Sequence, residues 1–155
     1  MDPFDEYKFF SDSTQRLTER RLAASQTFMT VNTIVFDVLS FATNNTIAGG
    51  WTRLLVSLPL FTVGALACLL WHHTITRYRA LIGWRFDELM QMEQSPRLEG
   101  SHQFFTKEYE HFYRHPGEPE RFGFSAVEVW LPRMFLAVYT VYLVGLTVVT
   151  IAGKR

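Results

Sequence analysis

Two long stretches without a charged residue constrain this chain more than any other feature. Residues 54–71 are 18 consecutive uncharged residues, and residues 134–153 are 20 more. A helix of about 20 apolar residues crosses the roughly 30 Å hydrocarbon core of a bilayer, so each stretch predicts a transmembrane helix. A third span, less apolar, is predicted over residues 23–48 and contains one charged residue, Asp37. The fold class is therefore predicted to be all-α and membrane-integral, with three spans.

The remaining residues divide the chain into parts outside the bilayer. Trp51 and Trp71 bracket the second span, as interfacial aromatic residues do. The lone Cys68 lies inside that span, so a disulfide within the chain is excluded. The predicted order is a cytosolic N-terminal helix (1–22), the spans 23–48 and 51–71, a cytosolic stalk and helical region (72–125), the span 126–152, and a short external tail (153–155).

Helical periodicity continues beyond the second span. Apolar residues recur at steps of three and four through residues 75–92, which predicts a stalk helix that runs from the membrane into water and stops at Ser95-Pro96. A short helix over residues 103–113 and a loop over 115–120 are expected to follow. The apolar residues on the stalk are Ile75, Tyr78, Ile82, Phe86, Leu89 and Met92.

The distribution of Lys and Arg predicts the orientation. Twelve basic residues fall in the N-terminal segment, in the long middle segment and at Arg133, and the other three are Arg53, Lys154 and Arg155. Because basic residues concentrate on the cytosolic side, the N-terminus and the middle segment are expected in the cytosol and the C-terminus outside. The expected location is the bacterial inner membrane.

A polar stripe follows one face of the first span. Its residues recur at steps of three and four, and an ionised Asp37 at bilayer depth costs on the order of 3 kcal/mol on insertion scales, so lipid exposure is unfavourable. Either the stripe lines a water-filled path between several protomers, or Asp37 is protonated and bonds Tyr139 or Tyr142 inside the bundle. The predicted pore-lining residues are Thr30, Thr33, Asp37, Ser40 and Asn44.

Cations and aromatic rings alternate at the start of the stalk. This mixture suits phosphates and stacked bases, although arginines that follow a span also contact anionic headgroups. The predicted signal-binding residues are Arg77, Arg79, Trp84 and Arg85.

Catalytic and metal sites find little support in the sequence. Glu108, His111 and His115 have the spacing of metal ligands on a helix but lack a fourth ligand. Arg97 and His102 have the R-x4-H spacing of certain ribonucleases, a pattern that also arises by chance. No phosphate loop, nucleophile elbow or HExxH helix is present. We therefore expect no cofactor, no metal and no enzyme.

Several segments together resemble a family of small bacterial integral membrane proteins. The residues that carry the resemblance are EYKFF and RLTERR within 6–21, WHHTITRYRAL at 71–81, MQME at 90–93, and FGFSAVEVWLPRMFLAVY at 122–139. Similar proteins are effectors in anti-phage operons, beside nucleotidyltransferases that make a nucleotide or oligonucleotide signal. In such systems, including the Hailong type, the effector is a membrane channel whose opening halts the infected cell.

The resemblance and the stripe together favour a homo-oligomeric channel that a cytosolic nucleotide or single-stranded oligonucleotide gates. The expected partners are other copies of the chain, the lipid bilayer and an operon-encoded nucleotidyltransferase. Two alternatives stay open. One is a non-conducting adaptor that anchors a soluble partner through residues 97–125, and the other is a membrane nuclease that uses Arg97 and His102.

Overall fold

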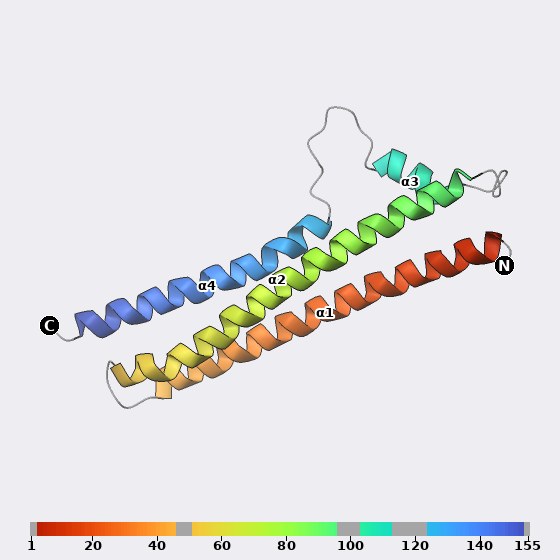
Figure 1. Ribbon diagram of the computed structural model, residues 1–155. Helices are drawn as coiled ribbons and strands as arrows, with labels where there is room; N and C mark the ends of the chain where they lie inside the picture. Colours follow the sequence, from red (N-terminus) through yellow and green to blue (C-terminus); the bar gives the residue numbers. More distant parts are fainter. Residues whose placement is uncertain (1–2, 46–50, 96–102, 113–123, 154–155) are drawn as a thin grey trace. The chain divides into compact units, whose positions relative to one another are not determined.

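Long helices make up nearly all of the structure. It is a computed structural model that describes residues 3–45, 51–95, 103–112 and 124–153. The helices are α1 (Pro3–Asn45), α2 (Trp51–Glu93), α3 (Phe104–Phe112) and α4 (Phe124–Ala152), and these residues contain no strand (Figure 1). Three of the helices, α1, α2 and α4, are long and apolar enough to cross a membrane. The all-α class with three transmembrane helices is thereby confirmed.

The first two spans are each part of a longer helix. Helix α1 runs without interruption through residues 3–22 of the predicted N-terminal helix and residues 23–45 of the predicted first span, whose last residues, 46–48, lie outside the described residues. Helix α2 contains both the predicted second span and the stalk helix. Helix α2 ends at Glu93, two residues before the predicted stop at Ser95-Pro96. Helix α3 agrees with the short helix predicted over 103–113, whereas the loop predicted over 115–120 lies outside the described residues. Where the bilayer meets each helix stays a prediction.

The chain divides into two compact units. The first unit comprises residues 1–23 and 76–127, and it contains the charged ends of α1 and α2 together with α3. The second unit comprises residues 24–75 and 128–155, which include the apolar parts of α1, α2 and α4. We refer to them as the polar unit and the membrane unit.

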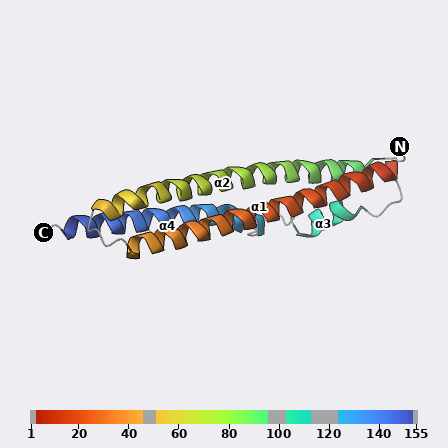
Figure 2. The same ribbon diagram turned by 90° about the horizontal axis from the view of Figure 1, so that it is seen from below.

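In the membrane unit three helices lie side by side in both views (Figures 1 and 2). Helix α2 runs antiparallel to α1 and α4, so the C-terminal ends of α1 and α4 lie at the end where α2 begins (Figure 1). The buried core contains two residues of α1, two of α2 and one aromatic residue of α4. Its buried members are Val35, Leu39, Phe61, Cys68 and Tyr139.

Tyr139 of α4 contacts both of the other helices of the membrane unit. Its ring stacks on Phe36 of α1 with the centroids 4.3 Å apart. On the other side it packs against Gly64 of α2, where an added Cβ would lie 2.7 Å from the tyrosine Cε1 and Oη atoms. Only a residue without a side chain lets α2 approach the ring this closely, which accounts for glycine in the middle of a transmembrane helix.

The outer surfaces of α2 and α4 in the membrane unit are largely apolar. Large exposed side chains of this kind on a soluble protein would favour aggregation, whereas in a bilayer they contact acyl chains. On α2 they are Leu55, Val56, Leu58, Val63, Leu66, Leu69 and Leu70, and on α4 they include Met134, Val138, Val141, Val144, Val148 and Val149.

The prediction that Trp71 faces the headgroups is wrong. Its side chain is completely buried, stacked on Phe28 at 6.2 Å and tilted against Phe135 at 5.8 Å between ring centroids. Two aromatic neighbours from other helices outweigh the interfacial preference of a single indole. Trp51, at the other end of the span, is half exposed.

In the polar unit, α2 contributes the predicted apolar face. Ile82 and Leu89 are buried, and Phe86 reaches α3, where its ring meets Phe105 with centroids 5.7 Å apart. Helix α1 contacts the same side through Tyr7, whose ring lies 6.4 Å from that of Phe105. This packing holds the first turn of α3 against the ends of α1 and α2.

Candidate functional site

The five residues of the polar stripe all lie on the exposed surface of α1 in the membrane unit. The opposite face of α1 is buried against α2 and α4 through residues such as Asn32, Val35 and Leu39. The stripe is bordered by exposed apolar side chains, among them Ile34 and Phe41. The outward face of α1 therefore carries a row of polar side chains that is bordered by apolar ones.

Not every residue of the stripe needs a partner. The hydroxyls of Thr30 and Thr33 donate to the backbone carbonyls of Gln26 and Met29, each at 3.0 Å. Such bonds to the preceding turn make threonine tolerable at bilayer depth. A carboxylate is only an acceptor, and the backbone N–H groups within a helix are already bonded. Asp37 is thus the residue of the stripe that most requires water, a cation, a proton or another subunit.

The alternative in which Asp37 bonds a tyrosine of its own bundle is wrong. The hydroxyl of Tyr139 lies 3.3 Å from the Asn32 side-chain oxygen, and that of Tyr142 lies 2.8 Å from the Thr43 hydroxyl. Both tyrosines therefore bond the buried face of α1, whereas Asp37 occupies the exposed face. A helix turns by about 100° per residue, so residues 32 and 37 point in different directions.

Asn32 organises the polar interior of the membrane unit. It is fully buried, its amide nitrogen donates to the Phe28 carbonyl at 2.8 Å, and its oxygen accepts from the Cys68 thiol at 3.2 Å. With the Tyr139 contact, one amide joins side chains of all three spans. Buried polar groups satisfied in this way specify a single packing arrangement, because any rotation of a helix leaves one of them unpaired.

The four predicted signal-binding residues do not converge on one surface. Arg77 and Arg79 are both exposed on α2, but two residues correspond to about 200° of rotation, so they lie on opposite sides. Arg85 is half-buried, and its Nη1 donates to the Ser13 hydroxyl of α1 at 2.8 Å. The guanidinium of Arg85 also lies over the Phe10 ring at 5.4 Å. Trp84, exposed, meets the same ring edge-on at 6.4 Å.

A buried carboxylate in the polar unit escaped the sequence reasoning. Glu93, the last residue of α2, accepts the backbone N–H groups of Phe105 and Thr106 at 2.9 Å. It also accepts the hydroxyls of Thr106 and Tyr7 at 2.8 Å. The first turn of a helix has unpaired N–H groups and a positive dipole end, and a carboxylate satisfies both. This arrangement, which we call the Glu93 cap, joins α1, α2 and α3.

The cap also changes the acidity of its members. Burial raises the pKa of Glu93, but the hydrogen bonds from Phe105, Thr106 and Tyr7 to the carboxylate outweigh it and leave the pKa below its usual value. For Tyr7, burial and the bond to Glu93 raise the pKa of the phenol. Glu93 therefore stays charged and Tyr7 stays protonated near neutral pH, which keeps the phenol as the donor.

The remaining candidate sites gain no support. Glu108 and His111 lie exposed on α3, and no group of three metal-binding side chains occurs among the described residues. His115 lies outside them, as do Arg97 and His102 of the nuclease alternative.

The comparisons with known proteins give the family. A sequence model described as the octameric membrane protein family (8xMP) matches residues 4–148 of this chain. The chain belongs to the octameric membrane protein family. No curated protein and no solved structure matches it. Membership agrees with the three apolar helices, and it establishes a membrane protein that associates with copies of itself.

Self-association explains how the stripe of this 8xMP chain is exposed in one subunit without facing lipid. The surface of an isolated subunit includes every face that contacts another subunit in the assembly. The stripe and its apolar borders are therefore exposed in one chain without having to face lipid in the membrane.

The sequence did contain a signal for the Glu93 cap. Leu89 lies on the buried face of the stalk, and Glu93 follows it by four residues, which returns the helix to that face. An acidic residue in phase with an apolar face is predicted to be buried and paired. Asn32 has the same relation to Val35 and Leu39, but its partners on α2 and α4 could be found only from the structure.

Replacing Glu93 by Gln should loosen α3. The amide keeps the shape but turns one acceptor into a donor, so at least one N–H of the first turn loses its partner, at a cost of about 1–3 kcal/mol. Hydrogen exchange of the Phe105 and Thr106 amides should accelerate in Glu93→Gln and stay unchanged in Glu108→Gln, which alters an exposed residue of the same helix.

The effect should depend on pH. Because the pKa of Glu93 is lowered on folding, its contribution is complete above the unfolded value of about 4.3 and is lost as pH falls through the folded pKa. The exchange difference between wild type and Glu93→Gln should therefore shrink below about pH 4. A difference that persists undiminished at lower pH contradicts a charged cap.

Proposed function

We propose that this chain assembles, as an octamer in keeping with the family description, into an ion channel of the bacterial inner membrane. Its lumen is lined by Thr30, Thr33, Asp37, Ser40 and Asn44. The observation that carries the proposal is the exposed Asp37 on a membrane-spanning helix whose opposite face is fully packed. Three helices in one subunit cannot enclose a water path, whereas a ring of subunits can.

The chemistry of the stripe suits cations. Each threonine hydroxyl gives its hydrogen to the backbone, so its oxygen is available to accept from water or to contact a cation. A ring of Asp37 carboxylates adds negative charge at one level of the path, as in cation-selective channels. The apolar borders, Ile34 and Phe41 among them, provide side chains for contact between neighbouring subunits.

The resemblance to anti-phage effectors supplies the biological part of the proposal. In this role the channel is an effector of bacterial defence, and a nucleotide or oligonucleotide made by an operon-encoded nucleotidyltransferase gates it. The N-terminus and residues 72–125 then lie in the cytosol, where the signal is produced, and the C-terminus lies outside. The chain is not an enzyme in this proposal, since the signal binds without reaction.

Arg85 can couple the binding of the signal to the helix that lines the lumen. Its guanidinium bonds Ser13 and covers Phe10, both on α1, the helix that also carries Asp37. A phosphate that binds Arg85 competes with the Ser13 hydroxyl, because both use the same N–H donors. Binding then favours states in which α1 is released from this contact, and a ligand shifts the equilibrium only through such differential affinity. Trp84, exposed next to Arg85, can contribute a stacking contact, and Arg77, exposed about two turns away on α2, can contact another phosphate of an oligonucleotide.

A second function, a non-conducting adaptor, draws on the exposed aromatic residues of the polar unit. Phe9 and Phe104 are each about two-thirds exposed, and Trp84 is more than half exposed, although all three lie outside the predicted spans 23–48, 51–71 and 126–152. A soluble partner could cover them. Because an adaptor needs no water path, measurements of ion flux separate the two functions.

Asp37 substitutions should change conduction in liposomes that contain the purified protein. Losing about 1.4 kcal/mol of cation attraction lowers flux about tenfold, so Asp37→Leu should reduce cation flux by at least that factor. Asp37→Asn should preserve some flux but reduce the preference for cations, read from the reversal potential. Glu6→Gln, on the first turn of α1, is the matched control and should have no effect. Unchanged flux in an Asp37→Leu protein that still assembles would count against conduction along this face.

Arg77 and Arg85 should contribute to signal binding. The probe is a fluorescently labelled oligodeoxythymidylate, titrated with the full-length protein in detergent and followed by anisotropy. Arg77→Gln should weaken binding and reduce the slope of log affinity against log salt by about 0.7, the value for one phosphate contact on a single strand. Arg20→Gln, an exposed arginine of α1, serves as the control. Equal slopes for wild type, Arg77→Gln and Arg85→Gln contradict this assignment.

A further inference from the structure

A cation–aromatic pair lies at the start of the apolar part of α4 in the membrane unit. The Arg133 guanidinium lies over the Trp130 ring, 5.6 Å from its centroid. Both side chains are exposed, and more than half of the Trp130 surface is accessible. Among the described residues no carboxylate pairs with Arg133. The ring therefore orients a positive charge that has no counter-charge in the described part of the chain.

The position of this pair along α4 predicts that it lies at the level of the lipid headgroups. The uncharged residues 134–153 begin directly after Arg133. Side chains on a helix lean toward its N-terminal end, so an arginine here extends away from the apolar run and toward water. Arginine reaches the headgroup layer in this way, and tryptophan is enriched there. The pair is thus expected beside lipid phosphates in either orientation of the chain.

The pair has the donors that a phosphate needs. A guanidinium presents its N–H groups in one plane and can donate two of them to a single phosphate. The indole ring covers one face of that plane and leaves its edges open, and the indole N–H is a further donor. Because the ring already orients the guanidinium, less side-chain freedom is lost when a phosphate binds.

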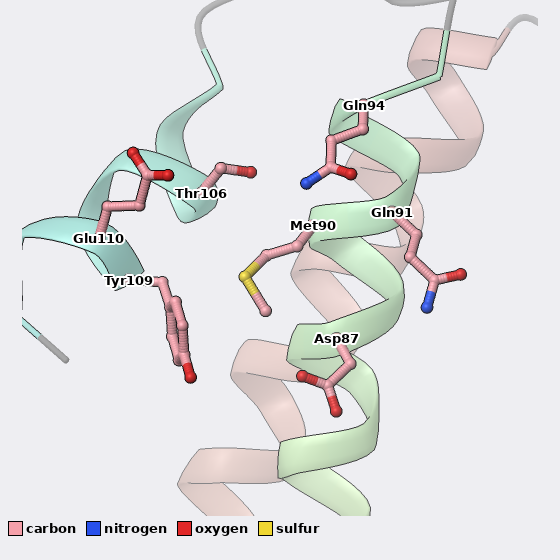
Figure 3. Close-up of a pocket in the computed structure, with 7 residues that line it drawn as sticks. All are labelled: Asp87, Met90, Gln91, Gln94, Thr106, Tyr109 and Glu110. Carbon is pink, nitrogen blue, oxygen red and sulfur yellow. The ribbon is translucent and has the colours of Figure 1, made fainter. Parts of the chain in front are cut away.

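The groove between α2 and α3 in the polar unit is a poorer place for an anion. None of its lining residues is basic and two are acidic, so it repels a phosphate. The residues that line it are Asp87, Met90, Gln91, Gln94, Thr106, Tyr109 and Glu110 (Figure 3).

Beyond the pair, apolar side chains continue along the same face of α4. Met134, Val138 and Val141 follow Trp130 at steps of four, four and three, and each is more than half exposed. From Trp130 to Val141 the helix rises about 16 Å, which is close to half of the roughly 30 Å hydrocarbon core. This length matches an acyl chain of one leaflet. A free phosphate would use only the donors, whereas a lipid uses the donors and this face.

We propose that Arg133, Trp130 and the apolar face that follows them bind an anionic phospholipid. The lipid phosphate accepts two N–H groups of Arg133 and the indole N–H of Trp130, and an acyl chain lies along Met134, Val138 and Val141. A zwitterionic lipid binds less well, because its own ammonium group offsets the charge of its phosphate. The site requires neither conduction nor gating, so it does not rest on the proposed function.

Native mass spectrometry of the full-length protein in detergent tests the site by counting the lipids bound per chain during a titration. The probes are dioleoylphosphatidylglycerol, dioleoylphosphatidylcholine with the same acyl chains, and glycerol 3-phosphate, which has no chains. Phosphatidylglycerol should bind saturably, one per chain, and more tightly than either of the others. Arg133→Gln should weaken its binding about fivefold, the equivalent of about 1 kcal/mol for one basic residue at an anionic surface.

Trp130→Leu keeps an apolar side chain but removes the ring and its N–H. It should weaken phosphatidylglycerol binding about two- to fivefold, since a cation–π contact at an exposed site contributes about 0.5–1 kcal/mol. The matched control is Arg16→Gln, which removes an exposed arginine of α1 and the same net charge, and it should bind as wild type does. Circular dichroism and the size of the assembly verify that the variants are folded.

Four results would overturn the proposal. Equal losses in Arg133→Gln and Arg16→Gln indicate diffuse attraction by all basic residues. Equal affinity for the two lipids indicates that the acyl chains alone bind. Glycerol 3-phosphate that binds as tightly as phosphatidylglycerol indicates a site for free phosphate. Absence of saturable binding indicates that no lipid site exists on this face.

Discussion

Hydrocarbon cannot solvate the carboxylate of Asp37, and no side chain among the described residues of the subunit bonds it on the exposed face where it lies. Exposure to lipid costs on the order of 3 kcal/mol for each charged side chain on insertion scales, and simulations of isolated helices give more. For each subunit this cost is a large part of the roughly 5–15 kcal/mol of net stability that is typical of a folded protein. Asp37 therefore needs water, a cation, a proton or a polar group of another subunit.

The membrane unit divides its polar groups into two sets. On one face of α1, Asn32 and Thr43 bond Tyr139, Tyr142 and Cys68, so the interior is satisfied without water. On the opposite face, the threonines bond their own backbone and Asp37 remains. The first set fixes which face of α1 points inward. As a result, the second set is presented outward as a single line, and a self-associating family provides the neighbours that can enclose it.

Much of the architecture could be predicted, because it depends on periodicity and length. The three spans, the extension of the second span into a stalk, and the apolar face with Ile82 and Leu89 follow from the order of apolar residues. The exposure of the stripe could not be predicted, because the sequence shows that Thr30 and Asp37 share a face but not which face packs inward. The alternative in which Asp37 bonds a tyrosine of its own bundle could not be excluded from the sequence for that reason.

The contacts of individual side chains were harder to predict than the helix faces on which the side chains lie. Trp71 was expected at the headgroups from its position at the end of an apolar run, but Phe28 and Phe135, distant in sequence, enclose it. Arg85 was grouped with Arg77 and Arg79 because cations and aromatic rings alternate there. In the structure, however, its guanidinium donates to the Ser13 hydroxyl of α1. The phase of Glu93 on the stalk indicates that it is buried, but no local pattern reveals its bond to Tyr7, 86 positions away. Contacts between helices decide each of these cases.

Chemical modification of single cysteines in the assembled protein tests the central claim most directly. In a Cys68→Ala background, cysteines replace Thr30, Thr33, Asp37, Ser40 and Asn44 one at a time, and Leu55 and Leu69 as lipid-facing controls. The protein in liposomes is treated with a charged, membrane-impermeant thiol reagent. A lumen along α1 predicts rapid modification at the five stripe positions, including Asp37, and none at the two controls. A stripe as unreactive as the controls, in protein that still assembles, contradicts the account.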